Sequence, residues 1–169
     1  LREVRFDVIK GNISEIAYLA EGIGTTKGVD ANLDALSTEG NLRWHTDLAR
    51  KVSTQTGAAI VISGPIDIVA DSHEAWAIRN GHPMMANITG TGCMSAGVIG
   101  CCVGADPQAL LPSCVCAMSA MGICGELAYE KLLSVDGGSG TYRVLLMDAM
   151  SKLDGATLTR RSKAERLRI

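Results

Sequence analysis

Apolar residues recur along the chain at spacings that predict short strands and helices. The alternation over residues 4–9 predicts a strand, and apolar residues on one helical face predict a helix over residues 12–21. A second helix is expected over residues 42–56, because Gly57 is a residue type that commonly ends a helix. The continuous apolar run at residues 58–62 predicts a strand buried on both faces. This succession of strands and helices is typical of an α/β protein with a parallel sheet.

The pattern changes after this run. Short apolar stretches at residues 66–70 and 75–78 predict two further strands. Asn80-Gly81 follows them, and this dipeptide is typical of tight hairpin turns. We therefore expect a local antiparallel excursion in this part of the chain.

Helices are expected over most of the remaining chain. One covers about residues 93–103, a long one covers residues 106–133 with an irregularity at Pro112, and a last one follows a glycine-rich turn. Residues 109–125 carry no charge, which raises the question of a membrane span. Pro112, two serines and the following Glu126 favour a buried core helix instead.

The carboxyl-terminal end is strongly basic. From Arg160 to Ile169 the chain carries five basic residues and one acidic residue. We expect residues 156–169 to form a solvated basic tail outside a domain of residues 1–155. An anionic partner for this tail is the open alternative.

Composition limits the classes of protein to which the chain can belong. With 169 residues and 47% hydrophobic content, it has enough apolar mass for one compact domain and is too short for two ordinary ones. Its net charge of -2, from 16 basic and 18 acidic residues, provides no basic field for nucleic acid. No secretory signal pattern is visible, so we expect a cytoplasmic protein without membrane partners.

The six cysteines all lie between Cys93 and Cys124, and none forms a C-x-x-C pair. This spacing fits neither a disulfide framework nor a zinc site. Five of the cysteines lie in apolar stretches, where we expect them to be small buried hydrophobic residues in a reducing compartment.

The segment Gly90-Thr91-Gly92-Cys93 opens one of the predicted helices. Glycines at this place let the backbone approach a ligand closely, and a helix N-terminus offers unpaired N–H groups with a partial positive charge. Such a site can hold an anion and stabilise the charge that develops in phosphoryl transfer. The same field favours a thiolate, which makes Cys93 a candidate base toward a substrate hydroxyl. A glycine-rich connection followed by a buried cysteine explains the same residues about equally well.

Lys10, Asn12 and Glu15 lie near the end of the first predicted strand. Asn followed three residues later by Glu predicts a capping box, which accounts for Asn12 and Glu15 without any ligand. In the functional interpretation, the three side chains gather where α/β sheets bind ligands. Lys10 would then meet a phosphate, and Glu15 would attract Mg²⁺ directly or through water.

Ser63 stands in a polar turn directly after the buried strand, followed by Gly64-Pro65 and Asp67. Its hydroxyl could donate a hydrogen bond to a phosphate or nucleotide. Ser before Gly-Pro also commonly starts a turn, so a purely structural role is the alternative.

Six segments, taken in chain order, form a distinctive set: Lys10–Ile16, Gly28–Asp30, Ile62–Asp67, Asn80–Met85, Gly90–Cys93 and Gly122–Ala128. Together they resemble the carboxyl-terminal part of the hydroxyethylthiazole kinase family, which belongs to the ribokinase-like superfamily. The resemblance covers almost the whole chain to about Leu153. It implies an α/β fold of three layers, α/β/α, with a mostly parallel central sheet. Residues 1–155 would then be the carboxyl-terminal part of a single kinase domain.

The resemblance also implies an activity, the ATP-dependent phosphorylation of the hydroxyl of 4-methyl-5-(2-hydroxyethyl)thiazole in thiamine salvage. Cys93 matches the family's catalytic cysteine, which acts as a base. Gly90 matches a glycine at the substrate, and Gly90, Thr91, Gly92 and Cys93 together match the anion hole.

On the nucleotide side, the resemblance implies ATP as co-substrate and Mg²⁺ as cofactor. Ser63 falls on a position where the family has a Thr or Ser that contacts the nucleotide. Lys10 falls on a position that is usually Arg. The bidentate contact that a guanidinium makes with phosphate is therefore replaced by the single charge of an ammonium group. Asn12 and Glu15 match the Asn-x-x-Glu motif that is associated with Mg²⁺, directly or through water.

One departure from the family pattern concerns the amino-terminal half. Family members carry thiazole-binding residues and an Asp-Pro-Val-Gly stretch there, and neither appears in this sequence. We therefore expect a fragment, or a site completed by another chain, and little or no activity from this chain alone. The family also implies a homotrimer for the intact protein, with the site at a subunit boundary.

Three other functions remain open. Hydroxymethylpyrimidine kinase, a relative, also uses a Gly-Thr-Gly-Cys loop, although the Asn80–Met85 segment favours the thiazole enzyme. A non-catalytic remnant that binds nucleotide is the second alternative. A redox or acyl-transfer cysteine protein is the third and ranks last, because no histidine is placed to activate Cys93.

Overall fold

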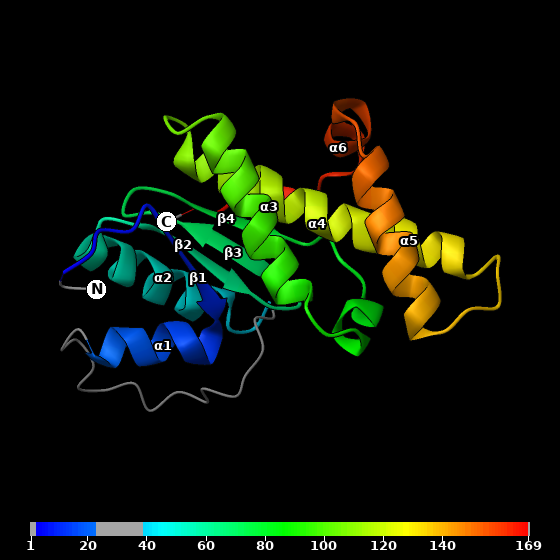
Figure 1. Cartoon of the computed structure of the whole chain (residues 1–169). Coiled ribbons are helices and arrows are strands. Elements are labelled where there is room, and N and C mark those ends of the chain that lie inside the picture. The colour runs from blue at the N-terminus through cyan, green and yellow to red at the C-terminus, as the bar shows by residue number, and fades with distance from the viewer. Residues whose placement is uncertain (1–2, 23–38, 169) are drawn as a thin grey trace. The chain divides into compact units, whose positions relative to one another are not determined.

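The computed structural model describes residues 3–22 and 39–168, and the segment Gly28–Asp30 lies outside them. The chain divides into two compact units, whose helices and strands are labelled in Figure 1. The first comprises residues 1–77, 108–112 and 165–169, and the second comprises residues 78–107 and 113–164.

A five-stranded sheet has the order β1-β2-β3-β4-β5. Its strands are β1 (Val8–Asn12), β2 (Ala59–Ser63), β3 (Asp67–Ala70), β4 (Ala75–Ile78) and β5 (Ala164–Arg166). β1 and β2 pair in parallel, while β2 and β3 pair antiparallel. The α/β prediction is confirmed, but the sheet is mixed rather than mostly parallel.

The first strand lies further along the chain than the alternation of residues 4–9 suggested. Pairing with β2 decides its place, because Val8 is opposite Ala59 and Asn12 is opposite Ser63. Val4 and Phe6 precede the paired region and are 58% and 43% exposed. Alternation alone cannot show where a strand finds its partner.

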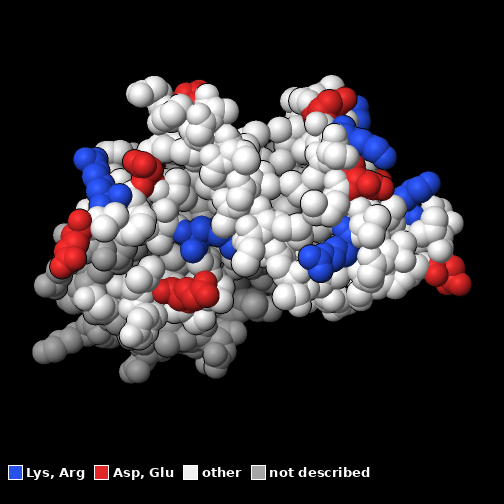
Figure 2. All heavy atoms as spheres, in the orientation of Figure 1, with Lys and Arg blue, Asp and Glu red and all other residues white. Residues whose placement is uncertain are grey.

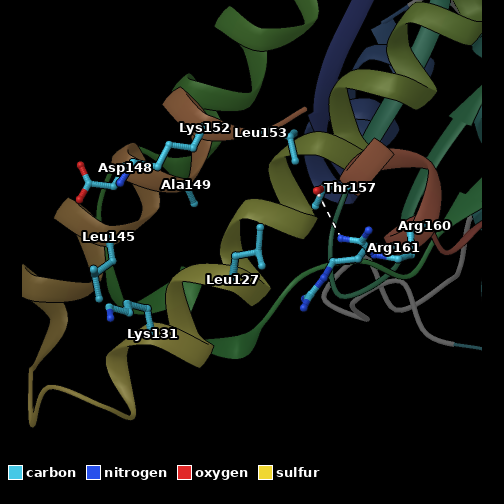
Figure 3. A pocket seen from close by; sticks show the side chains of 10 residues that line it. All are labelled: Leu127, Lys131, Leu145, Asp148, Ala149, Lys152, Leu153, Thr157, Arg160 and Arg161. Atoms are coloured by element: carbon cyan, nitrogen blue, oxygen red, sulfur yellow. Dashed lines mark hydrogen bonds between the residues drawn. The ribbon is translucent and has the colours of Figure 1, made fainter. Parts of the chain in front are cut away.

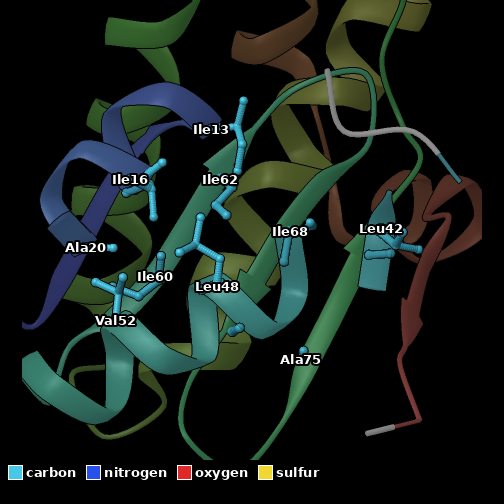
Figure 4. Packing of buried hydrophobic residues seen from close by; sticks show 14 of the residues in the cluster. Ile13, Ile16, Ala20, Leu42, Leu48, Val52, Ile60, Ile62, Ile68 and Ala75 are labelled. Carbon is cyan, nitrogen blue, oxygen red and sulfur yellow. The ribbon is translucent and has the colours of Figure 1, made fainter. Parts of the chain in front are cut away.

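Helices α1 (Ile13–Gly22) and α2 (Leu42–Thr56) confirm two predictions from the apolar spacing. After α2, Gly57 adopts φ 73°, a left-handed conformation that favours glycine, and its N–H donates to the Ser53 carbonyl. The apolar faces of both helices pack against alternate residues of the sheet (Figure 4). The buried members drawn there include Ile13, Ile16, Ala20, Leu48, Val52, Ile60, Ile62 and Ile68.

The predicted hairpin at Asn80-Gly81 is wrong. The turn between β3 and β4 lies at residues 71–74, where Asp71 Oδ1 accepts from the N–H groups of His73 and Glu74 at 2.7 and 2.8 Å. The side chain of Asn80 is used differently, because its amide donates to the Arg161 carbonyl at 2.9 Å. Asn80 is of a residue type that favours local turns, but here its side chain makes a long-range hydrogen bond instead.

The second unit is mainly helical. It contains the 3₁₀ helix η1 (Pro83–Asn87), α3 (Thr91–Ala105), most of α4 (Leu110–Leu132), α5 (Ser139–Lys152) and α6 (Gly155–Arg161). Its core joins α4 to α5, and the buried Tyr142 hydroxyl donates to the Gly125 carbonyl at 3.0 Å.

Helix α4 is long and apolar enough to cross a membrane by length and composition, and 61% of its most apolar window is buried inside the protein. This burial agrees with the predicted core helix. Pro112 does not disturb it, because the helix begins at Leu110 and a proline in the first turn removes no intrahelical hydrogen bond.

The predicted solvated tail is corrected, because residues 155–161 form α6 and residues 164–166 form β5. The N–H of Leu167 donates to the Ala75 carbonyl at 2.8 Å, and that of Arg79 donates to the Lys163 carbonyl at 3.2 Å. Strand pairing therefore orders a segment whose composition suggested a tail.

The cysteine prediction is also corrected in part. All six are free thiols, and Cys114 and Cys124 are buried as expected. Cys93 and Cys101 are exposed, however, and the other two are half-buried. Apolar neighbours in the sequence did not guarantee burial on α3.

Candidate functional site

Lys10 and Ser63 meet at the carboxyl ends of the parallel strands β1 and β2. The Lys10 ammonium donates to Ser63 Oγ at 3.3 Å, and Ser63 Oγ donates to the Gly11 carbonyl at 3.4 Å. The parallel register brings the two residues together, because Asn12 is opposite Ser63. Open α/β sheets bind ligands at this edge, and an ammonium beside a hydroxyl can hold phosphate oxygens there.

Asn12 and Glu15 form the predicted capping box at the start of α1. The N–H of Asn12 donates to Glu15 Oε2 at 2.7 Å, and the N–H of Glu15 donates to Asn12 Oδ1 at 2.9 Å. A Cβ at Gly11 would lie 3.0 Å from Glu15 Oε2, so a glycine here lets the carboxylate lie tightly against the end of β1. The structural interpretation of these residues therefore holds, whatever else they do.

Asn12 and Glu15 differ in how well their side-chain oxygens can bind Mg²⁺. Asn12 Oδ1 already accepts from Ser14 Oγ and from the Glu15 N–H, which uses both of its lone pairs. Glu15 Oε1 accepts no hydrogen bond within the part of the chain that the structure describes, so it can face Mg²⁺ or a water on the ion. Among the described residues, no group of three His, Cys, Asp or Glu side chains could hold a metal ion. Glu15 fits a partly hydrated Mg²⁺, whereas a direct bond from Asn12 would have to displace a hydrogen bond.

Asp67 belongs to this group, although the sequence motif assigned it no role. It is the first residue of β3, and its Oδ1 accepts from the Gly64 N–H at 2.9 Å. Burial raises the pKa of Asp67 to about 7, while the Gly64 N–H and the charge of Lys10 act in the opposite direction. An acidic residue four positions after Ser63 was the available signal, but its burial depends on the folded sheet.

The Gly90–Cys93 segment lies in the second unit and starts α3. Gly90 precedes the helix with φ 99°, a conformation that L side chains rarely adopt, although a Cβ there would meet nothing within 4 Å. The first helical hydrogen bond runs from the Met94 N–H to the Gly90 carbonyl at 2.8 Å. The N–H groups of Thr91, Gly92 and Cys93 therefore point out of the helix end, as an anion site requires.

Side chains around this helix end support the same geometry. Thr91 Oγ1 donates to the Met85 carbonyl at 3.5 Å, which ties the start of α3 to η1. The Cys93 side chain is exposed in the first turn of the helix.

The predicted residues thus form two groups. Lys10, Asn12, Glu15 and Ser63 lie together in the first compact unit, and Gly90–Cys93 lies in the second. Each group has a geometry that suits phosphate: a cation with a hydroxyl in one case, and a helix N-terminus with an exposed thiol in the other.

Two relatives show high similarity over nearly the whole chain. The first, a hydroxyethylthiazole kinase of Desulfovibrio desulfuricans, is 50% identical over 176 residues, which cover 100% of this chain and 62% of that protein. The second, from Clostridium acetobutylicum and of the same name, is 45% identical over 94% of this chain and 58% of its own length. The chain therefore spans about three fifths of the curated relatives it matches.

A solved structure supports the fold independently. It is described as the structure of a hydroxyethylthiazole kinase protein from Pyrococcus horikoshii OT3, and it matches with a TM-score of 0.77 at 24% identity. The match covers 96% of this chain and 55% of that one. The sequence profile described as the hydroxyethylthiazole kinase family matches residues 1–156. With this profile and two relatives above 30% identity, the chain belongs to the hydroxyethylthiazole kinase family.

Proposed function

We propose that this chain forms the nucleotide-binding and phosphate-binding part of a kinase that transfers the γ-phosphate of ATP to the hydroxyl of 4-methyl-5-(2-hydroxyethyl)thiazole. The observation that carries the proposal is the contact of Lys10 with Ser63, 3.3 Å from Nζ to Oγ, at the ends of two parallel strands. Membership of the kinase family supplies the reaction class.

On the nucleotide side, Lys10 attracts the phosphates and Ser63 Oγ donates to a phosphate oxygen. For that donation, Ser63 turns its proton away from the Gly11 carbonyl, to which it is bound only weakly at 3.4 Å. Mg²⁺ neutralises phosphate charge when bound, and Glu15 Oε1 is the atom that would hold it or its water. Asn12 keeps Glu15 in place through the capping box.

On the acceptor side, Cys93 acts as the base. Its thiolate takes the proton of the substrate hydroxyl while the alcohol oxygen forms a bond to the γ-phosphorus. The bond between that phosphorus and the β,γ-bridging oxygen breaks, and ADP leaves with the electron pair. The N–H groups at the start of α3 stabilise the charge on the phosphoryl oxygens during transfer, and Gly90 leaves room for the substrate.

The test uses the protein at the full length that its gene encodes, with ATP, Mg²⁺ and one alcohol at a time. We expect ADP release with the thiazole alcohol and not with hydroxymethylpyrimidine. Cys93→Ala should lower kcat by at least about 100-fold, because general-base catalysis contributes on that scale. Cys101→Ala is the matched control, since Cys101 is also exposed on α3.

Three results would contradict parts of this proposal. Turnover with the pyrimidine alone would assign the chain to the rival substrate. An unchanged rate in Cys93→Ala would remove the base. Nucleotide binding without turnover of either alcohol would favour a non-catalytic remnant.

We also propose that the intact protein is a cytoplasmic homotrimer. The support is family membership, and the measurement is molar mass by light scattering during size-exclusion chromatography. A monomer at micromolar concentration would contradict the oligomeric proposal.

A further inference from the structure

A hollow of about 380 Å³ lies among three helices of the second unit (Figure 3). Its volume is within the range of about 300–1,000 Å³ that is usual for small-molecule sites. Residues from α4, α5, α6 and the connection between α5 and α6 line it, namely Leu127, Lys131, Leu145, Asp148, Ala149, Lys152, Leu153, Thr157, Arg160 and Arg161. None of them belongs to the proposed kinase site.

Part of the lining is apolar and firmly supported. Leu145, Ala149 and Leu153 pack against the buried core that contains Tyr142 and Leu146, yet each stays partly exposed. Leu127 on α4 adds a fourth partly exposed apolar side chain. These side chains offer a fixed apolar surface to a ligand, and covering it would be favourable.

The polar part of the lining is mostly cationic. Lys131, Lys152, Arg160 and Arg161 face a single acidic residue, Asp148. Arg161 forms a bidentate salt bridge with Glu130, with N···O distances of 2.7 and 3.0 Å. This salt bridge holds the guanidinium in place and offsets its charge. The other three cations make no salt bridge within the described parts of the chain, so they can attract an anion, although the Asp154 carboxylate near Arg160 offsets part of that charge.

The helix dipole offers a simpler explanation for these positive charges. All four cations lie in the last turns of their helices, where positive charge is favourable in any case. This explanation accounts for the charges one helix at a time. It does not account for the apolar side chains left partly exposed between the three helices.

We propose that this hollow binds a small organic anion that combines an apolar body with a phosphate or carboxylate head. The body would cover Leu145, Ala149 and Leu153, and the head would pair with Lys152 and Arg160. The Thr157 hydroxyl accepts from Arg160 at 3.4 Å, and it also hydrogen-bonds the Asp154 carboxylate, so it positions Arg160 rather than the head itself. This site is separate from the proposed kinase function and does not depend on it.

The experiment titrates the protein with hexyl phosphate, hexanoate, hexanol and inorganic phosphate, and follows backbone amide shifts by NMR. We expect saturable binding of at least one of the two amphipathic anions, with shifts confined to α4, α5 and α6. Hexanol and inorganic phosphate should each bind at least about tenfold more weakly, because each lacks one half of the interaction. The comparison of hexyl phosphate with hexanoate identifies the head group.

Variants separate this site from the nucleotide site. Lys152→Glu combined with Arg160→Glu should weaken binding at least about tenfold, and Arg143→Glu is the matched control on α5, exposed and outside the lining. Lys10→Met should have no effect. The proposal is overturned if hexanol binds as well as the anions, if the double variant keeps wild-type affinity, or if the shifts map elsewhere.

Discussion

Asp67 is the residue at which burial and charge oppose each other most clearly. Its carboxyl lies beside the Gly64 N–H and near Lys10, and burial still keeps its pKa at about 7. The folded protein therefore holds a proton on Asp67 over a pH range in which the unfolded chain has lost it. Asp67 should therefore contribute to the pH dependence of stability.

Asp67→Asn tests this dependence. The stabilising contribution is full below the unfolded pKa of 3.8 and is lost as the pH rises through 7, whereas asparagine has no proton to lose. We expect the variant to gain roughly 1–3 kcal/mol over the wild type between pH 5 and pH 8, measured by urea denaturation. Asp71→Asn, in another turn of the same sheet, is the control. An equal trend in both variants, or none in Asp67→Asn, would contradict the assignment.

At the scale of elements, the start of α3 depends on one glycine. Gly90 has φ 99°, whereas Gly97 lies within the helix, and an added Cβ meets nothing within 4 Å at either position. Any difference between the two alanine variants therefore reports backbone conformation rather than crowding.

Gly90→Ala and Gly97→Ala should change stability in opposite directions. The first forces a side chain into a left-handed conformation and should lower the free energy of unfolding by about 1 kcal/mol. The second replaces a helical glycine by the best helix former and should raise it by about 0.5–1 kcal/mol. Chemical denaturation of both variants checks this, and a loss of the same size in both would contradict it.

The helices and strands also show which parts of the fold the sequence could predict. α2 was predicted with its bounds, because its apolar spacing and Gly57 are local signals. The capping box of Asn12 and Glu15 was predictable for the same reason. The position of β1 and the hairpin turn were not, since each depends on a partner distant in the chain.

At the scale of the whole molecule, distant segments meet at Asn80, which is 4% exposed. Its amide donates to Glu126 Oε1 at 3.2 Å and to the Arg161 carbonyl, and its oxygen accepts from the Lys163 N–H at 2.7 Å. The basic composition of the last residues suggested a tail because Asn80, to which Arg161 and Lys163 are bonded, lies more than 80 positions earlier.

Asn80→Ala should lower stability by about 2–4 kcal/mol, because it leaves several half-buried groups without a hydrogen bond. Asn87→Ala is the control, since Asn87 is exposed and, among the described residues, its amide donates to the Met84 sulfur alone, at 3.4 Å. Thermal or urea unfolding compares the two. Equal, small losses would mean that Asn80 does not anchor the carboxyl-terminal segment.

The assignment of the candidate site rests on both local and long-range information. The motifs around Lys10, Ser63 and Gly90–Cys93 identified residue types suited to phosphate, and the parallel register then explained why Lys10 and Ser63 touch. The motif could not predict the raised pKa of Asp67, because the burial that raises it arises only when the sheet forms.

The most direct test of the central claim is the affinity of the protein for a non-hydrolysable ATP analogue with Mg²⁺, measured by calorimetry for the wild type and Lys10 variants. If Lys10 and Ser63 form the phosphate contact, Lys10→Met weakens binding at least about tenfold, or about 1.4 kcal/mol, while Lys10→Arg retains it. Arg43→Ala, on the exposed side of α2, controls for general charge and leaves affinity unchanged. Wild-type affinity in Lys10→Met would contradict the account.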